Sequence, residues 1–361
     1  MNILIITGDY FPVKSPRSLR ATELSKELIV QGHKVDVLTH KHIDFQKEFE
    51  NKFGIEIINF QLKKWQTYLG KTGFGNLFFK IISRIYLFHY YFLVRQSFDN
   101  LKKYDSVITV SVPFPIAWGL ASFSKKKIKD KFGVWVADLG DPFMLNKGLK
   151  SKPFFLFHYF ERNMLKKADY VTVPFIEMKS QFYNRFHKKL HVIPQGVPMG
   201  VEVSIYKQNK PLKIGFSGYI YKGSRDIFSL IDYLISQEYD FEFYIYTNQR
   251  DLFAQYKEFI GNQLLLFDYV DREKLILELS KLDFLVAVNF DSFNNQITAY
   301  PSKLIDYALS KRPILMYENS RLPLKVIEEF MNYNFINKTI VDIEKYNIKT
   351  VAKQFIQLIL S

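Results

Sequence analysis

The chain alternates short apolar runs with longer stretches in which apolar residues recur at helical spacing. In its first half, the apolar runs have the length and composition of strands that are buried on both faces of a sheet. These expected strands are Ile3–Thr7, Val35–Thr39, Ile55–Phe60, Val107–Val110, Val134–Ala137, Tyr170–Val173 and Leu190–Ile193. Strand-helix alternation of this kind predicts a parallel, doubly wound sheet.

The segment Ser18–Gln31 is the clearest helix of this half, and Gly32-His33 is the stop signal that follows it. Its apolar stripe consists of Leu19, Leu24, Leu28 and Ile29.

The alternation restarts after Pro211, and the polar stretch from Gln195 to Pro211 is the expected linker. The second set of strands is Lys213–Ser217, Phe241–Tyr246, Leu264–Phe267, Phe284–Val288 and Ile314–Met316. The helices between them are Arg225–Ile235, Arg250–Phe259, Arg272–Lys281, Ser302–Ser310 and Leu322–Tyr333. We therefore expect an α/β protein of two tandem Rossmann-like domains with a cleft between them, residues 1–196 and 197–340. A helix in 341–361 could cross back to the first domain.

The composition is that of a globular protein, with 48% hydrophobic and 24% charged residues. Because the chain has no cysteine, it has no disulfide framework, no thiolate nucleophile and no cysteine-ligated metal. The N-terminus lacks the basic lead of a signal peptide, and no uncharged run has the length of a transmembrane helix. These features predict a cytoplasmic protein.

The net charge of +14 lies entirely in the first part of the chain. Residues 1–200 carry 31 Lys and Arg against 16 Asp and Glu, whereas residues 201–361 carry 19 against 20. A basic half favours an anionic surface as partner, either nucleic acid or a membrane. No nucleic-acid-binding motif accompanies the charge, so we favour an anionic membrane. The aromatic run Leu69–Phe98 is either a core helix or an interfacial helix, and the sequence leaves both open.

The segment from Tyr300 to Leu315 carries the strongest chemical signal. Ser302 can cap a helix whose first turn holds Lys303, where the helix dipole favours an acid instead. A lysine beside free backbone N–H groups is typical of a phosphate site. Asp306 follows one turn later, within reach of the same ligand.

A second candidate phosphate loop, Gly215–Asp226, follows the first strand of the second domain. Gly218 and Gly223 allow the backbone to approach a ligand closely, and Lys222 and Arg225 add positive charge. Two basic residues on this loop, together with Lys303, predict a diphosphate site at one edge of the sheet.

In the first domain, the loops that begin at Gly8 and at Asp138 leave expected strands at their carboxyl ends. One carries Asp9 and leads to Arg20, and the other carries Asp138 and Asp141. Asp141 precedes a proline and is therefore held extended, either as a substrate contact or as a turn former. No pair of histidines has metal-ligand spacing on a helix, so we expect no metal.

In the order and spacing of these pieces the chain resembles a GT-B glycosyltransferase, in particular the retaining family 4 enzymes that build bacterial capsule, O-antigen or exopolysaccharide. The similar segments include Leu28–Val35, Ser111-Val112-Pro113, Asp138–Phe143, Ile193–Val197 and Phe216-Ser217-Gly218. The sequence departs from the family at Asp306 and Thr298, which replace paired glutamates, at Gly140, which replaces a common arginine, and at Gln195, which replaces an asparagine.

The resemblance implies a metal-independent transfer of a sugar from a nucleotide diphosphate sugar to a lipid-linked glycan. The expected catalytic residues are Asp141, Lys303 and Arg225. The expected donor-binding residues are Gly218, Lys222, Ser302, Asp306, Tyr269 and Asn289. The expected acceptor-binding residues are Arg20, Asp9 and Asp138. Two alternatives stay open: a nucleotide-sugar epimerase of similar fold, and a non-catalytic protein that binds a glycan or a partner.

Overall fold

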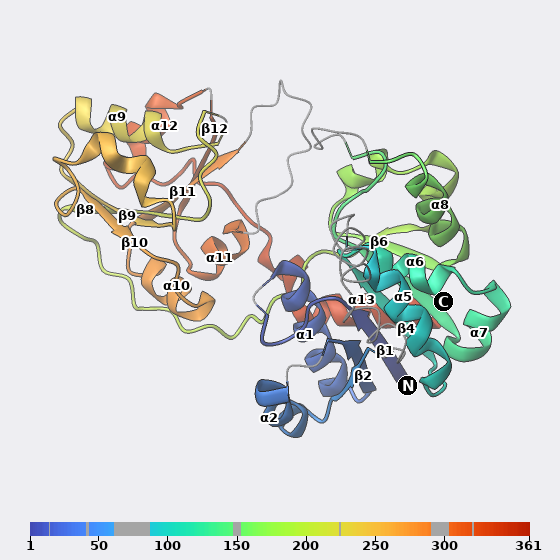
Figure 1. Cartoon of the computed structure of the whole chain (residues 1–361). Helices are drawn as coiled ribbons and strands as arrows, with labels where there is room; N and C mark the ends of the chain where they lie inside the picture. The colour runs from blue at the N-terminus through green and yellow to red at the C-terminus, as the bar shows by residue number, and fades with distance from the viewer. Residues whose placement is uncertain are drawn as a thin grey trace, which may run out of the picture. The chain divides into compact units, whose positions relative to one another are not determined.

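The computed structural model describes residues 1–13, 15–40, 43–60, 87–146, 153–223, 225–289, 303–319 and 321–361 (Figure 1). The chain forms two compact units. Unit 1 comprises Met1–Val197 together with Lys345–Ser361, and unit 2 comprises Pro198–Glu344. The cleft expected between two domains stays a prediction.

Unit 1 is built on a parallel sheet with the strand order β3-β2-β1-β4-β5-β6-β7. Every strand expected from the apolar runs of the first half is present. The strands are β1 (Asn2–Thr7), β2 (Lys34–Thr39), β3 (Glu56–Asn59), β4 (Ser106–Ser111), β5 (Val134–Leu139), β6 (Tyr170–Val173) and β7 (Leu190–Val192).

Helices cover both faces of this sheet. Successive strand residues point to opposite faces, so Leu4 and Ile6 of β1 face one helical layer, and Ile3 and Ile5 face the other. The first layer consists of α5 (His89–Ser97), α6 (Pro115–Ala121), α7 (Lys125–Phe132) and α8 (Phe157–Lys167). The second consists of α1 (Pro16–Val30), α2 (Ile43–Phe53) and α13 (Ile348–Leu360). Short 3-10 helices occupy Phe98–Asn100, Ile176–Gln181, Asn184–Lys189 and Ile343–Tyr346.

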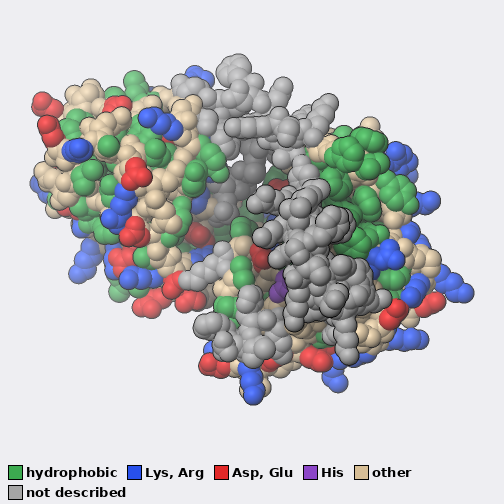
Figure 2. All heavy atoms as spheres, viewed as in Figure 1, with side chains coloured by type: hydrophobic (Ala, Val, Ile, Leu, Met, Phe, Trp, Pro, Cys, Tyr) green, Lys and Arg blue, Asp and Glu red, His purple; other side chains and the backbone are tan. Residues whose placement is uncertain are grey.

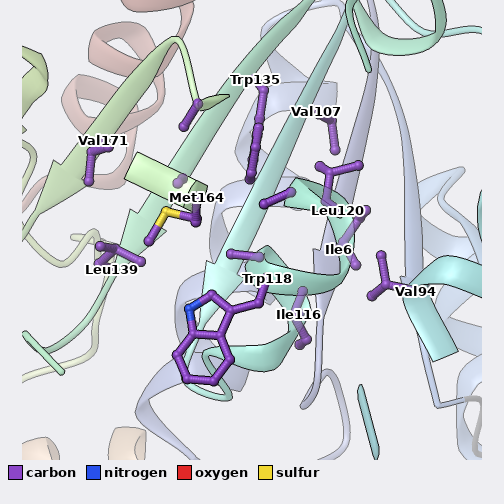
Figure 3. Packing of buried hydrophobic residues seen from close by; sticks show 14 of the residues in the cluster. Ile6, Val94, Val107, Ile116, Trp118, Leu120, Trp135, Leu139, Met164 and Val171 are labelled. Carbon is purple, nitrogen blue, oxygen red and sulfur yellow. The ribbon is translucent and has the colours of Figure 1, made fainter. Parts of the chain in front are cut away.

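Two buried tryptophans lie between the sheet and the first layer (Figure 3). Trp135 of β5 donates from Nε1 to Thr109 Oγ1 at 3.0 Å, so its one polar atom is satisfied. Trp118 of α6 stacks on Phe157 and Phe160 of α8, with ring centroids 5.4 and 5.7 Å apart. This aromatic packing joins α6 to α8 over the sheet.

The structure describes only the last part of the Leu69–Phe98 run, because residues 61–86 lie outside the described residues. Helix α5 buries Tyr90, Leu93 and Val94 in the core, whereas Phe92 is 36% exposed. The described part of the run is therefore a core helix with an exposed aromatic edge. In the described parts of the chain, no helix has the length and apolarity needed to span a bilayer.

The end of the chain packs in unit 1. Asn347 caps α13, and its helix buries Val351, Ala352 and Phe355 against the same face as Ile3 and Ile5. Val197 N–H donates to the Tyr346 carbonyl at 2.8 Å, so both crossings between the units lie side by side.

Unit 2 has a parallel sheet with the order β10-β9-β8-β11-β12. The strands are β8 (Leu212–Ser217), β9 (Phe241–Tyr246), β10 (Leu264–Phe267), β11 (Phe284–Asn289) and β12 (Ile314–Glu318). The helices are α9 (Phe228–Ser236), α10 (Arg272–Leu279), α11 (Lys303–Leu309) and α12 (Leu324–Met331). The α-helix expected at Arg250–Phe259 is instead a 3-10 helix over Arg250–Tyr256.

In both sheets the order in which the chain adds strands reverses next to the first strand of the unit. In unit 1 the chain order reverses between β1 and β4, and in unit 2 between β8 and β11. Ligands of doubly wound sheets bind outside the carboxyl ends of the strands at this switch point.

Candidate functional site

Lys303 begins α11 and reaches the carboxyl end of β8 in unit 2. Its Nζ lies 4.2 Å from the centre of the Phe216 ring. Burial and, secondarily, the charge of Arg225 lower the pKa of Lys303 well below its ordinary value. No carboxylate pairs with Lys303 among the described residues. The position is thus a cation held in an apolar setting, which an anionic ligand would stabilise.

Tyr307 and Asp306 hold the helix that carries Lys303. The buried Tyr307 hydroxyl accepts from Ser217 N–H at 2.8 Å, which ties α11 to the end of β8. Asp306 pairs with Arg272 of α10, with Nε–Oδ1 at 2.7 Å and Nη2–Oδ1 at 2.6 Å. Burial raises the pKa of Asp306, and the Arg272 charge opposes that rise. The Asp306 carboxylate therefore has a structural partner, and its predicted ribose contact stays a prediction.

Arg225 supplies the second cation at the switch point. Its Nε donates to the Val288 carbonyl at 2.7 Å, which places the guanidinium at the carboxyl end of β11. Tyr221 and Arg225 exchange two backbone hydrogen bonds and close a turn, and Lys222 is exposed at its tip. The charge at the start of α11 and the charge of the Tyr221–Arg225 turn thus lie at the central strands of unit 2.

Gly218 stays a predicted donor contact, but its N–H group already has a partner in the structure. Gly218 N–H donates to the Tyr246 carbonyl at 3.0 Å, so it is not free to bind a phosphate. The residue instead has φ +123°, a conformation that favours glycine. A Cβ there would lie 4.0 Å from Lys303 Cδ. Gly218 therefore leaves open space beside the lysine.

Exposed tyrosine rings lie on loops at the same edge. Tyr219 and Tyr221 are 57% and 47% exposed, with ring centroids 4.9 Å apart. Tyr269 is 48% exposed, and its N–H donates to Asn248 Oδ1 at 3.2 Å. Asn289 ends β11, and its amide lies 3.5 Å from Met316 Sδ. Ser302 and Thr298 lie outside the described residues.

In unit 1, Arg20 and Asp138 form a buried ion pair and not an exposed acceptor site. Their side chains are each 2% exposed. Arg20 donates to both carboxylate oxygens, with Nε–Oδ2 at 3.1 Å and Nη2–Oδ1 at 3.0 Å. Arg20 also donates to the Ile193 and Pro194 carbonyls, and Thr172 Oγ1 donates to Asp138 at 2.7 Å. Neither side chain reaches the surface in the structure, and the expected contact of these two residues with an acceptor stays a prediction.

Asp9 and Asp141 keep accessible positions at the same strand edge. Asp9 follows β1 and accepts from Ser15 Oγ at 3.0 Å. Asp141 follows β5 and is exposed. Both stay candidates for a contact with substrate.

Sequence reasoning missed Arg17, Tyr307, Arg272 and Glu161. Arg17 lies in the first turn of α1, beside Asp138, and its cation at a helix start is the same signal that singled out Lys303. Glu161 is buried and accepts from Met144 N–H at 3.3 Å, next to the Asp141 loop. Burial raises the pKa of Glu161 to about 7. No local sequence signal marks Tyr307, Arg272 or Glu161, because each acts through a distant partner.

Among the described residues, no three His, Cys, Asp or Glu side chains come together in a way that could hold a metal ion. The cations at the switch point of unit 2 are the groups there that suit an anionic ligand.

No family model matches the sequence, and a search of curated proteins finds no match. Solved structures do match over the whole chain. TarM superposes with a TM-score of 0.64 at 12% identity, covering 100% of this chain and 99% of TarM. The chain has the GT-B fold.

Other GT-B structures agree with this assignment. The lipopolysaccharide outer core galactosyltransferase WaaB gives a TM-score of 0.59 at 13% identity, over 100% of this chain and 99% of WaaB. The UDP-GlcNAc 2-epimerase from Neisseria meningitidis, bound to UDP-GlcNAc, gives 0.56 at 12% identity, over 100% of both chains. The expected fold class is thereby confirmed. Because transferases and an epimerase share the GT-B fold, the reaction must be argued from the site.

Proposed function

We propose that this protein is a glycosyltransferase that takes a sugar from a nucleotide diphosphate sugar. The observation that carries the proposal is the meeting of Lys303 and Arg225 at the switch point of unit 2. Lys303 is held there without a carboxylate partner among the described residues. A donor diphosphate supplies the negative charge that this position lacks. Galactosyl transfer by WaaB, the GT-B protein compared above, supports the same reaction class.

The chemistry assigned to these residues is stabilisation of the leaving group. When the bond between the anomeric carbon and the diphosphate oxygen breaks, negative charge develops on that oxygen. Lys303 and Arg225 neutralise this charge in a preorganised setting, the role that a metal ion has in other transferases. An acceptor hydroxyl forms the new bond to the anomeric carbon and passes its proton to the departing diphosphate oxygen. We propose that transfer is retaining and metal-independent, and that Asp141 contacts the sugar or the acceptor.

The nucleotide and the ribose are assigned to the exposed edge around these cations. The exposed rings of Tyr219, Tyr221 and Tyr269 offer faces on which a base can stack. One oxygen of Asp306 is held by Arg272, and Oδ2 has no partner among the described residues, so it can accept from a ribose hydroxyl.

A panel of nucleoside diphosphates tests the proposal. At least one of UDP, GDP, CDP, ADP and dTDP should raise Tm, whereas the parent nucleoside should not. At a hundred times Kd the stabilisation is about 2.7 kcal/mol, or roughly 5–10 °C for a domain of this size. The matching nucleotide sugar should then be hydrolysed or transferred without added metal. Absence of stabilisation by every diphosphate would leave only the non-catalytic alternative.

The same assay separates transfer from epimerisation. The epimerase in the comparison was solved with UDP-GlcNAc, so epimerisation remains the second candidate. An epimerase converts the sugar while it stays attached to the nucleotide and needs no acceptor. Recovery of an isomeric nucleotide sugar from an acceptor-free reaction would support that candidate and contradict the transferase proposal.

We further propose that the acceptor is a lipid-linked glycan, which unit 1 meets at an anionic membrane. Apolar side chains gather over α8 and the segment before it (Figure 2), and exposed apolar side chains at α5 extend this patch. Its side chains are between 36% and 71% exposed. The apolar patch consists of Leu87, Phe92, Phe154, Phe155, Leu156 and Tyr159.

Ring contacts make this patch continuous. Phe88 joins its two sides, with ring centroids 5.9 Å from Phe92 and 5.3 Å from Phe160. Phe160 lies 5.8 Å from Tyr159. The charges beside it have one sign. Arg95, Arg162 and Lys166 are exposed, and Glu161, the only acid in α5 or α8, is 3% exposed. Aromatic side chains with basic neighbours suit an anionic lipid surface.

Liposome flotation tests the membrane contact. Wild-type protein should float with vesicles that contain roughly one-third phosphatidylserine when the salt concentration is low. Less of the protein should float at high salt. The double variant Phe155→Asp, Tyr159→Asp should lose at least about tenfold in vesicle affinity, because two exposed aromatic groups no longer enter the interface. The matched control is Val30→Asp, since Val30 is 76% exposed on α1 outside the patch. Equal flotation of the double variant and the control would contradict the contact.

A further inference from the structure

Two guanidinium groups in unit 1 share one buried carboxylate. Asp138 accepts from Arg20 on both oxygens and from Thr172 on one of them. Arg17 reaches the same carboxylate only at 3.5 Å, between Nη1 and Oδ2. Asp138 is therefore satisfied by Arg20 and Thr172, and Arg17 adds an excess positive charge to the group.

The Arg17 side chain packs directly against Gly140. A Cβ at residue 140 would overlap Cζ, Nη2 and Nε of Arg17, so the guanidinium lies directly against the glycine backbone. Gly140 N–H in turn donates to the Ser111 carbonyl at 2.9 Å, which fixes the glycine at the carboxyl ends of β4 and β5. The position of the guanidinium is therefore set by the absence of a side chain at residue 140.

The Arg17 guanidinium keeps donors available in this position. Its side chain is 17% exposed, and among the described residues Asp138 is its ion-pair partner, at the longer distance. A guanidinium has five N–H donors, more than this one ion pair uses. Asp141, which follows Gly140 in the chain, is exposed. Burial lowers the pKa of Arg17, and the charges of Asp138 and Asp141 only partly offset this effect.

We propose that Arg17, seated on Gly140 at the switch-point edge of unit 1, binds an anionic group of the acceptor, either a phosphate or a sugar carboxylate. This inference rests on the proposed transferase function. Unit 2 holds Lys303 and Arg225 for the donor diphosphate, so the excess cation of unit 1 serves the second substrate. A planar guanidinium binds phosphate and carboxylate through paired hydrogen bonds, which suits both sources.

The test uses a Lys303→Met background, in which one of the two donor cations of unit 2 is removed. Inorganic phosphate and methyl glucuronide are titrated as probes, and neutral methyl glucoside serves as the reference ligand. Binding is measured by ³¹P line broadening for phosphate and by saturation transfer for the glycosides. We expect phosphate or glucuronide, but not glucoside, to bind. Arg17→Gln should weaken that binding by about tenfold or more.

Two further variants separate a binding role from a structural one. Gly140→Ala keeps the arginine but moves its guanidinium, so it should weaken binding as Arg17→Gln does. Arg17→Lys keeps the charge and should recover part of the affinity. Arg185→Gln, an exposed arginine of the same unit, is the matched control. If Arg17→Gln does not fold, Gly140→Ala carries the comparison.

Each result bears on the inference. Binding of phosphate alone supports a phosphorylated acceptor, and binding of glucuronide alone supports an acidic sugar. Absence of binding by both probes, or equal affinity of Arg17→Gln and Arg185→Gln, overturns the inference. Failure of the donor proposal is detected separately, because that failure is a lack of nucleoside diphosphate binding to the wild-type protein.

Discussion

Replacing Arg20 with methionine should lower the free energy of unfolding by about 3–5 kcal/mol, because the change leaves a buried carboxylate without its main partner. Asp138 is 1% exposed and takes two of its hydrogen bonds from Arg20. Arg20 also contacts the carbonyls that follow β7 and lies 5.0 Å from the Phe355 ring of α13. One side chain thus connects three separate parts of unit 1, and chemical denaturation measures its contribution.

The effect of Arg20→Met should depend on pH. Burial raises the pKa of Asp138, but Arg20 and Arg17 together outweigh burial and hold it below its ordinary value. In the wild type the unfolded state therefore binds more protons, and the stability from this group is lost as pH falls below about 4. In the variant burial prevails, the native state binds the proton more tightly, and stability falls as pH rises from about 4. The difference between the two proteins should widen from about pH 4 to 7.

Two controls distinguish loss of the ion pair from loss of packing. Arg17→Gln removes a guanidinium that lies farther from Asp138 and is more exposed than that of Arg20. This variant should therefore lose less stability than Arg20→Met. Arg20→Met combined with Asp138→Leu removes both charges and should recover much of the lost stability. If Arg20→Met is as stable as the wild type at pH 7, the ion pair between Arg20 and Asp138 contributes little to stability.

Replacing Lys303 with methionine should have opposite effects on stability and on binding. In the free protein the change removes a charge from an apolar site, and methionine can keep the contact with the Phe216 ring. Tm should rise by about 2–4 °C, which corresponds to roughly 1 kcal/mol. Affinity for the nucleoside diphosphate should fall by about 10–100-fold, because charge-assisted hydrogen bonds are lost. Thermal denaturation with and without the nucleotide measures both effects.

The sign of the pH dependence follows from the lowered pKa of Lys303. The unfolded state binds this proton more tightly, so the free wild-type protein gains stability as pH rises through the window that ends near the ordinary lysine value of about 10.4. A bound diphosphate raises the pKa again, so nucleotide binding takes up a proton and weakens with rising pH. Lys303→Met should abolish both dependences. Lys222→Met, at the exposed tip of the Tyr221–Arg225 turn, is the matched control and should leave the free protein unchanged. A Lys303 variant that keeps wild-type nucleotide affinity would remove this lysine from the site.

The strands were predictable from sequence because they are buried on both faces. A run such as Val107–Val110 has no polar alternation, and β4 buries all its residues. The helical stripe of α1 was less reliable. Leu19 is 44% exposed, whereas Arg20 beside it is 2% exposed. The reason is Asp138, a carboxylate 118 residues away, which makes a buried arginine favourable and is invisible to local periodicity.

The candidate site also has features that the sequence predicts and features that depend on tertiary contacts. Lys303 could be recognised because a cation in the first turn of a helix opposes the helix dipole. The loss of the Gly218 amide to Tyr246 could not be recognised, because that hydrogen bond depends on the pairing of β8 with β9. The packing of Arg17 against Gly140 could not be recognised either, because it is a tertiary contact between the start of α1 and the end of β5.

The return of α13 to unit 1 makes unit 2 an inserted domain. Pro198–Glu344 is continuous, and the residues on either side of it belong to one core, where Val351 and Phe355 pack with Ile3 and Ile5. Breaking one of the two crossings therefore leaves the resulting fragments held together by hydrophobic contact rather than by the peptide chain. Of the two units only unit 2 is a single uninterrupted stretch of chain, and this makes it the natural part to excise or exchange.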